Sequence, residues 1–329
     1  MAELDLAAVR AFVTAADEGQ FGYAADLLGI SQQAVSKRIA KLEGQLGVRL
    51  FDRTPSGSVV SAAGAKVLPY ARSLLAVAGE TLAAARPAGR ALRVAVQDQR
   101  QADSVRYYLD RRPDADIELV IGTAFRSSRD ALLNGRVDAA FARPHGGPRP
   151  LPAGIGITPA FVDPFHLLVG KDHPLAGRPS ITPADIVPYP SWAPGASIPS
   201  EWADFYRELT ASTAITILTG RTPGGAPERE DDRPAARGLA GKIAVLDRIA
   251  ASDTLSMFCA DSVTFPWHPH IRRLPVLNPT PAYPHALLWS TTDPHPALPD
   301  LIDHVRENYN GDILADCWIP EPDRAIFLP

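Results

Sequence analysis

Side chains that hydrogen-bond to nucleobases are concentrated in one short segment of the chain. Glutamine forms paired hydrogen bonds with adenine, serine bonds to several bases, and lysine reaches guanine or a phosphate. All three types lie on one side when residues 31–46 are placed at 100° intervals, as in an α-helix. They are Gln33, Ser36, Lys37 and Lys41, with Gln32 at the border of that side. Such a helix is suited to the major groove of double-stranded DNA.

The opposite side of this segment is apolar, which is what seals a recognition helix onto its domain. Val35, Ile39, Leu42 and Leu46 fall within a narrow arc. The alternative is an ordinary amphipathic helix whose polar side faces solvent. Against it, residues 31–53 hold five basic residues and two acidic ones, although the whole chain has 33 Lys and Arg against 37 Asp and Glu. Attraction to DNA is therefore expected from this patch and not from the net charge of −4.

The elements before this segment are those that would position it. Apolar residues spaced from Leu6 to Ala16 predict a first helix that ends at Gly19, and Phe21 to Leu28 predicts a short second helix. Gly29 then permits a tight turn, and Ser31 can cap the third helix. Helix, glycine turn and capped helix with a basic face predict a helix-turn-helix.

Residues 21–54 carry a resemblance to a known family. They read FGYAADLLGISQQAVSKRIAKLEGQLGVRLFDRT and resemble the DNA-binding signature of LysR-type transcriptional regulators, with a match that continues to Gly64. The resemblance implies that Gln32, Gln33, Ser36 and Lys37 are base-contacting positions. It also implies that Arg53 lies in a wing along the DNA backbone or minor groove.

Two positions depart from the family pattern. The wing, residues 55–60, lacks the extra arginines usual in the family, and Tyr23 stands where a basic residue is common. Each lost phosphate contact flattens the salt dependence of binding by about one unit of slope. We therefore expect weak nonspecific DNA binding and a strong reliance on dimerisation.

A long helix is expected to follow the wing and to pair two chains. Ser61 can cap a helix running to about Arg86, interrupted by Pro69, and its apolar faces need a partner. The alternative is that it packs on its own domain. The resemblance implies a homodimer or homotetramer. The expected domains are a winged helix-turn-helix (1–60), a linker helix (61–88), an effector domain (91–310) and a C-terminal extension (311–329).

The C-terminal part is predicted to be an α/β domain. Strands at 92–96, 117–121 and 137–142 alternate with helices at 104–112 and 127–134, which favours a parallel sheet with crossover helices. Apolar runs at 165–169 and 287–289 suggest a second sheet and a return to the first. The pattern resembles the two-subdomain effector domain of the same family, which is shaped like the periplasmic solute-binding proteins.

Ligands of open α/β sheets bind beyond the carboxyl ends of the strands. A small-molecule effector is accordingly expected between the two subdomains. Arg143 could grip a carboxylate with two parallel hydrogen bonds, or be a solvated loop residue. Asp98 could bind an amine or hydroxyl, although capping the next helix is the favoured role. The expected effector contacts are Gln97, Asp98, Gln99, Thr123, Arg143 and Trp192.

Other classes of protein fit the sequence less well. Cys259 and Cys317 allow a redox sensor, but neither has a local basic cluster to lower its pKa. His268 and His270 alone are weak evidence for a metal site. No catalytic motif, cofactor motif, signal peptide or membrane span is found, which disfavours an enzyme or a secreted binding protein. A DNA-binding protein without ligand response remains an alternative.

The sequence thus predicts a cytoplasmic regulator that binds promoter DNA, with RNA polymerase as a further partner and no cofactor or metal. Two segments have no predicted role. Residues 220–238 are rich in proline, glycine and charge and are expected to form a mobile loop. The extension 311–329 lies beyond the end of the family's usual domain.

Overall fold

The structure is a computed structural model that describes residues 4–18, 20–54, 57–84, 90–122, 128–194, 196, 199–219, 238–292 and 294–328. Thr123, residues 85–88 of the expected linker helix and residues 220–237 of the expected loop lie outside these ranges. The chain forms two compact units, Met1–Ala95 with Asp116–Ala140, and Val96–Ala115 with Phe141–Pro329.

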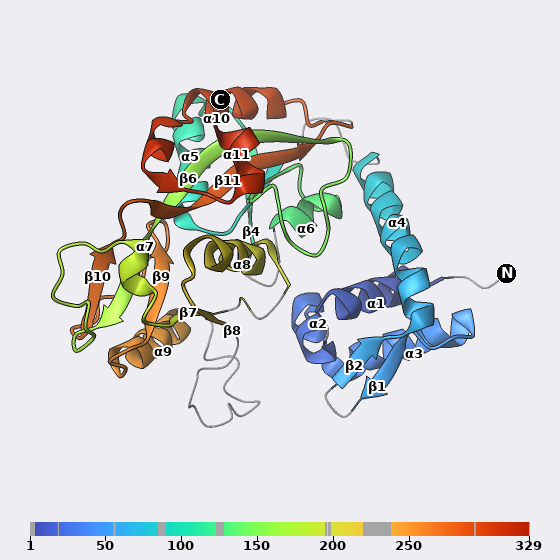
Figure 1. Cartoon of the computed structure of the whole chain (residues 1–329). Helices are drawn as coiled ribbons and strands as arrows, with labels where there is room; N and C mark the ends of the chain where they lie inside the picture. The colour runs from blue at the N-terminus through green and yellow to red at the C-terminus, as the bar shows by residue number, and fades with distance from the viewer. Residues whose placement is uncertain are drawn as a thin grey trace. The chain divides into compact units, whose positions relative to one another are not determined.

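The first unit begins with three helices (Figure 1), α1 (Leu6–Glu18), α2 (Phe21–Leu28) and α3 (Gln32–Leu46). Gly29 has a φ of 64°, the left-handed conformation that glycine adopts without steric cost and that this turn requires. Ser31 Oγ accepts a hydrogen bond from the Ala34 backbone N–H at 3.2 Å and caps α3. The predicted helix-turn-helix is confirmed.

A wing and a long helix follow. β1 (Phe51–Thr54) and β2 (Gly57–Val60) pair antiparallel, with Phe51 opposite Val60. α4 (Ala62–Ala84) is the expected linker helix, with Pro69 inside it. Ser61 caps it by accepting from the Gly64 N–H at 2.9 Å. A Cβ on Gly64 would lie 2.2 Å from the Leu50 carbonyl oxygen, so only glycine permits the wing to approach the helix this closely.

The alternating strands and helices predicted for the C-terminal part are present. β3 (Leu92–Val96), β4 (Ile117–Ile121) and β5 (Ala139–Ala142) lie in the order β4-β3-β5, and β3 and β5 are parallel. α5 (Gln99–Arg111) follows β3, and α6 (Ser128–Leu133) precedes β5. Because β3 and β5 are parallel, the residues that follow them, Gln97 and Arg143, leave the sheet at the same edge.

The second unit is organised around the sixteen-residue strand β6 (Ile155–Gly170). Its first part pairs antiparallel with β11 (Thr280–Ser290), and its second part with β9 (Ser256–Ala260) and β10 (Ile271–Pro275). Strands are present at both later apolar runs, but the expected second sheet is not separate: because β6 is long enough to pair on both parts, the strands form one ten-stranded sheet in the order β4-β3-β5-β11-β6-β9-β7-β8, with β10 paired to β6 and β12 paired to β11. This unit also contains β7 (Ser191–Ala193), β8 (Ile217–Thr219), α7 (Pro183–Ile186), α8 (Glu201–Thr213), α9 (Gly238–Ala250) and α10 (Leu298–Glu307).

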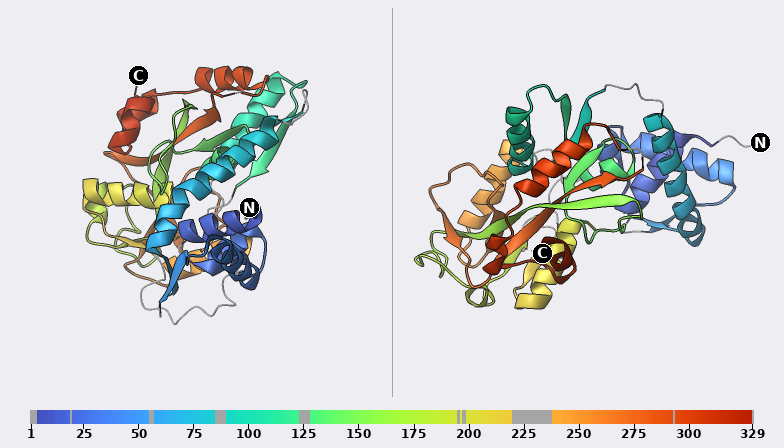
Figure 2. Two further views of the ribbon diagram at one scale, coloured as in Figure 1. Left: turned by 90° about the vertical axis from the view of Figure 1, so that its right-hand side faces the viewer. Right: turned by 90° about the horizontal axis from the view of Figure 1, so that it is seen from above.

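Alternating side chains of β6 and β9 point into two apolar cores. Leu167 and Phe258 belong to the core that includes Phe205 of α8. Leu168 and Met257 belong to the core that includes Ile249 of α9. α10 packs against α5 (Figure 2). Between them the rings of Tyr108 and His304 meet edge to face, with their centroids 5.5 Å apart.

The chain finishes on this same unit. A 3-10 turn η2 (Asp312–Ala315) leads to β12 (Cys317–Trp318), which pairs in parallel with the start of β11, and then to α11 (Glu321–Phe327). α11 packs against β6 (Figure 1), and Phe327 is completely buried. Among the described helices, none combines the length and the hydropathy needed to cross a lipid bilayer.

Candidate nucleic-acid interface and ligand site

The predicted recognition helix α3 separates its polar and apolar sides as expected. Val35, Ile39 and Leu42 are at most 2% exposed and belong to the helical core of the first unit. On the other side, Gln32, Gln33 and Lys37 are exposed, and Ser36 is half-buried. Side chains with hydrogen-bonding groups of the types that read base edges are therefore open to an approaching duplex.

Lys41 is exposed but is held by an ion pair that the sequence analysis did not foresee. Its Nζ lies 2.7 Å from Asp5 Oδ2. The hydrogen bond from Lys41, with a second from the Ala7 backbone N–H, lowers the pKa of Asp5. Asp5 Oδ1 also accepts from Ala7 N–H at 2.8 Å and so caps α1. The Asp5 carboxylate thus caps α1 and also pairs with Lys41 on the side of α3 that is predicted to face DNA.

Arg53 lies on β1, with its backbone paired opposite Ser58. It is therefore on the wing, where the resemblance implies that it should be. The side chains of Arg53 and Tyr23 and residues 55–56 of the wing lie outside the described part of the structure. The assignments of Gln32, Gln33, Ser36, Lys37, Lys41 and Arg53 as DNA contacts stay predictions.

At the edge where β3 ends, Asp98 takes the role that the sequence analysis favoured. Its Oδ1 accepts from the Gln101 N–H at 2.8 Å and caps α5. Burial raises the pKa of Asp98 to about 6. The neighbouring Gln97 and Gln99 are exposed. Asp98 is therefore a helix cap, and its burial makes the ionised form of the carboxyl group energetically unfavourable.

Behind this cap is a buried polar group that the predictions missed. Gln101 is fully buried, with its Nε2 3.0 Å from His285 Nδ1 and its Oε1 accepting from the Gln97 N–H at 2.6 Å. Burial lowers the pKa of His285 to about 3, so its ring is neutral at pH 7. The His285 ring stacks on Phe161 at 4.7 Å. The group links the end of β3 to the middle of β6 and β11.

A second buried polar group joins β6 to α5 and to the segment that follows β9. Asp163, on β6, is completely buried and accepts hydrogen bonds from the backbone N–H and the hydroxyl of Ser262. Arg100 lies 3.6 Å from Asp163 and over the Phe161 ring at 4.6 Å. Burial outweighs these partners and raises the pKa of Asp163. The carboxylate thus fixes β6 to the segment that follows β9.

Arg143 has an environment that neither of its predicted roles anticipated. It is 1% exposed, so the alternative of a solvated loop residue is wrong. Its Nε donates to Asp323 Oδ2 at 2.7 Å, its Nη2 to Glu208 Oε2 at 2.8 Å, and its Nη1 to the Glu201 carbonyl at 3.2 Å. Burial lowers the pKa of Arg143, but the nearby carboxylates more than offset it. The guanidinium does grip carboxylates, and they belong to the chain itself.

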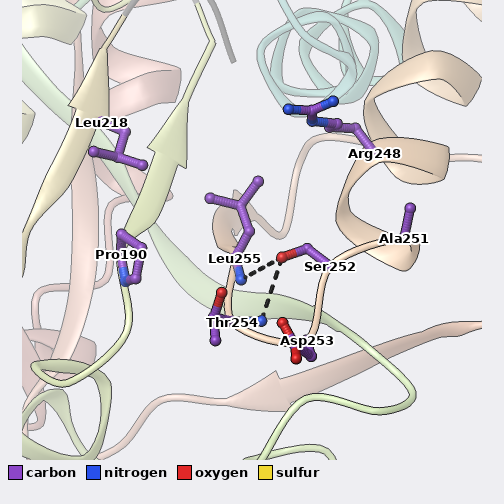
Figure 3. Close-up of a pocket in the computed structure, with 8 residues that line it drawn as sticks. All are labelled: Pro190, Leu218, Arg248, Ala251, Ser252, Asp253, Thr254 and Leu255. Atoms are coloured by element: carbon purple, nitrogen blue, oxygen red, sulfur yellow. Dashed lines mark hydrogen bonds between the residues drawn. The ribbon is translucent and has the colours of Figure 1, made fainter. Parts of the chain in front are cut away.

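The other predicted contacts are distributed differently. Trp192 packs with Leu218 against the core of α9, so its ring belongs to that core. Thr123 lies outside the described residues. A cavity of about 380 Å³ lies beside the turn after α9 (Figure 3) and includes none of the predicted residues. It is lined by Pro190, Leu218, Arg248, Ala251, Ser252, Asp253, Thr254 and Leu255.

The two cysteines lack the features of a redox switch. Both are free thiols, Cys259 buried and Cys317 half-buried. Burial raises the pKa of each to about 11, so both are protonated at neutral pH. His270 is exposed, whereas His268 is half-buried and lies 3.1 Å from Asp247. In the described ranges, no three His, Cys, Asp or Glu residues lie close enough together to hold a metal ion.

The missed residues left only partial signals in the sequence. Asp163 and His285 each interrupt an apolar strand, and such residues are either functional or satisfied internally. Asp323 is 180 positions from Arg143, and nothing local to either residue predicts their contact. Long-range polar pairs of this kind are a product of topology and not of local pattern.

Comparisons with known proteins agree with this arrangement. Residues 6–65 match the family model "Bacterial regulatory helix-turn-helix protein, lysR family", and residues 77–219 match "LysR substrate binding domain". A probable hydrogen peroxide-inducible genes activator of Mycobacterium xenopi is 31% identical over 184 residues, which cover 53% of this chain and 93% of that protein.

A further curated relative and a solved structure are also similar to this chain. The small neutral protease regulatory protein of Streptomyces coelicolor is 30% identical over 62% of this chain and 67% of its own length. Other curated relatives are spanned over little more than half of their length, as at 57% for the Mycobacterium avium protein. The crystal structure of full-length CbnR complexed with its target DNA covers 92% of this chain and 99% of that chain, at 23% identity and a TM-score of 0.49.

Proposed function

The chain belongs to the LysR family of bacterial transcriptional regulators, and on that premise we propose that the polar side of α3 reads its operator in the major groove. It is a DNA-binding regulator with an effector-binding domain and is not an enzyme. In the proposal, Gln32, Gln33 and Ser36 contact bases, while Lys37 and Lys41 contact guanine or phosphates. Arg53 contacts the backbone or minor groove from the wing.

The observation that carries this proposal is the two-sided character of α3. Its apolar side is sealed in the core, which fixes the helix on its domain, while Gln32, Gln33 and Lys37 remain open to solvent. An exposed helix with glutamine, serine and lysine in its first two turns matches the donors and acceptors of the major groove. A merely solvated side needs no such selection of residue types.

A second copy of the chain is the proposed partner on the protein side. Tyr70 and Val77 of α4 are 78% and 57% exposed, which is unusual for large apolar residues on one helix. β4 lies at one end of the strand order and exposes 78% of Ile121. Pairing of two chains through these surfaces would present two recognition helices to two half-sites. Dimers and tetramers both satisfy this requirement.

The proposed effector site lies at the edge where β3 and β5 end. Gln97, Asp98 and Gln99 border it on one strand and Arg143 on the other. A small molecule bound there would change the spacing of the DNA-binding heads and hence DNA bending and recruitment of RNA polymerase. This regulation would take place in the cytoplasm, where promoter DNA is found.

The test is footprinting of the full-length chain on the DNA upstream of its own gene. We expect a protected region with two half-sites separated by one helical turn or a multiple of it. Gln33→Ala should weaken binding by about 1–3 kcal/mol and relax the preference at one base pair of each half-site. Lys171→Ala, which removes one exposed positive charge of the effector domain, is the matched control and should leave binding unchanged.

The results distinguish contacts of Gln33 with bases from nonspecific contacts with the DNA backbone. Equal loss of binding on every sequence would mean that Gln33 contacts only the backbone. Unchanged affinity and unchanged base preference in Gln33→Ala would exclude the proposed role of this side of α3.

A further inference from the structure

Arg143 is the centre of a buried ion cluster at the edge proposed for effector binding. Each of its donating nitrogens has an acceptor from another segment: Nε has Asp323 of α11, and Nη2 and Nη1 have Glu208 and the Glu201 carbonyl of α8. The second oxygen of Asp323 lies 2.9 Å from His145 Nδ1. Both oxygens of this one carboxylate are therefore recognised, as in a site built for a carboxylate ligand.

The carboxylate is supplied by the last segment of the chain. α11 has seven residues, and its N-cap residue Pro320 makes no side-chain capping hydrogen bond; β12 before it has two residues. Besides Asp323, the segment is held by the buried side chains of Ile319 and Phe327, by the ring of Trp318 packed against Phe205 at 5.7 Å, and by a 2.5 Å hydrogen bond from the Tyr309 hydroxyl to the Phe327 carbonyl. Short terminal elements of this kind open locally at a lower free energy than the whole domain.

The cluster also holds the loop after β5 against the start of α8. The Gly147 N–H donates to Asp204 Oδ2 at 2.9 Å, beside the bond from Arg143 to the Glu201 carbonyl. Asp323 is completely buried and completes the neutralisation of Arg143. Without Asp323, Arg143 keeps Glu208 but loses its fully buried partner, and breaking a buried ion pair is strongly destabilising. A ligand that displaces Asp323 should therefore bring an anionic group of its own, and the planar fork of the guanidinium favours a carboxylate.

We propose that residues 316–328 are an internal ligand of the effector domain, with Asp323 in the carboxylate site of Arg143. This inference rests on the proposed function, since it assigns the regulation of the proposed effector site. An effector with a carboxylate takes the place of Asp323, the guanidinium stays paired, and α11 is released. One carboxylate exchanges for another, so no proton or bond changes hands. Release of α11 is then the switch to which the DNA-binding heads respond.

The experiment uses the full-length chain and two substitutions on the same helix. Asp323→Ala opens the carboxylate site, and Glu321→Gln removes an equal charge from an 89% exposed side chain of α11 that pairs only locally with Arg324. Sodium acetate is the probe, with sodium chloride at equal ionic strength as its control. Three readouts are taken: hydrogen exchange of residues 317–328, thermal stability, and affinity for the DNA upstream of its own gene.

In Asp323→Ala we expect exchange in residues 317–328 to rise by about tenfold or more. Acetate should raise its melting temperature saturably, whereas chloride should not. Its DNA affinity should differ at least threefold from that of the wild-type chain, and Glu321→Gln should match the wild type in all three readouts. Tyr309→Phe, which loosens the segment without touching the cluster, should shift exchange and DNA affinity in the same directions.

The opposite results are equally decisive. If acetate has no more effect than chloride on Asp323→Ala, Arg143 is not a carboxylate site that Asp323 occupies. If Asp323→Ala does not fold, unchanged DNA affinity in Tyr309→Phe despite faster exchange overturns the proposal by itself. Failure of the wild-type chain to bind the upstream DNA would instead refute the proposed function, and the acetate titration would still decide whether Asp323 is an internal ligand.

Discussion

Replacing Asp5 by asparagine should strengthen the electrostatic part of DNA binding, although Asp5 is not itself one of the predicted DNA contacts. In the free protein Asp5 Oδ2 holds Lys41 Nζ at 2.7 Å. When Lys41 moves to a phosphate, Asp5 is left as an uncompensated anion close to the DNA backbone and gathers a counterion. Asparagine removes that charge but retains a side-chain oxygen that can accept from the Ala7 N–H and cap α1.

The size of the effect follows from counterion release. Each phosphate neutralised by the protein contributes about 0.9 to the slope of log K against log salt concentration. One additional effective contact in each chain should therefore steepen the slope by about 0.9 per chain. Between 50 and 200 mM salt, a slope of this size amounts to about 3.5-fold in affinity per chain, and about twelvefold for a dimer.

The assay is fluorescence anisotropy of the labelled upstream DNA, titrated at four or more salt concentrations. Asp5→Ala is the control for helix capping, because it also removes the charge but leaves the first N–H groups of α1 without their side-chain acceptor. Both substitutions should give the steeper slope, while only Asp5→Ala should lower the melting temperature. A slope equal to that of the wild type in Asp5→Asn would refute the reasoning, since Lys41 would then make no phosphate contact.

Three further predictions concern other parts of the chain. Tyr70→Glu combined with Val77→Glu on α4 should reduce the assembly to a monomer in light scattering and weaken DNA binding at least tenfold, because each monomer then binds one half-site on its own and the two recognition helices no longer bind as one assembly. An unchanged molar mass would exclude this surface. Mild peroxide should leave Cys259 and Cys317 unmodified in intact-mass measurements, because burial keeps the pKa of both thiols near 11; an adduct at either cysteine would show a thiolate that this environment does not favour. Asp98→Asn should be more stable than the wild type at pH 7, by up to about 2 kcal/mol. The folded wild-type chain binds a proton at Asp98 more tightly than the unfolded chain does, so the wild type loses stability as the pH rises from about 4 to about 6. Identical stability curves for the two proteins between pH 4 and pH 7 would contradict this.

The DNA-binding half was predictable because its determinants are local. The three-residue and four-residue spacings around Val35 and Ile39, the turn at Gly29 and the cap at Ser31 lie within one stretch of chain and specify their structure together. The ion pair between Lys41 and Asp5 was not predictable, because it depends on how α3 crosses α1.

The effector half was predictable in its strands and less so in its site. β3, β4 and β5 follow from apolar runs and turn residues, and the cap at Asp98 follows from its place before a helix. The partners of Arg143 come from α8 and from the last helix of the chain, 58 to 180 positions away. Only the folded topology joins them, so sequence pattern alone indicates a cation at that edge and not what neutralises it.

The central claim is that the exposed side of α3 touches nucleobases, and photocrosslinking tests it most directly. A benzophenone amino acid is placed at Gln33 in one protein and at Asp303, a 62% exposed residue of α10, in a control protein. After irradiation with the upstream DNA, we expect covalent adducts from position 33 that map to bases within the half-sites, and none from position 303. No adduct at position 33, on DNA that the protein demonstrably binds, would contradict the claim.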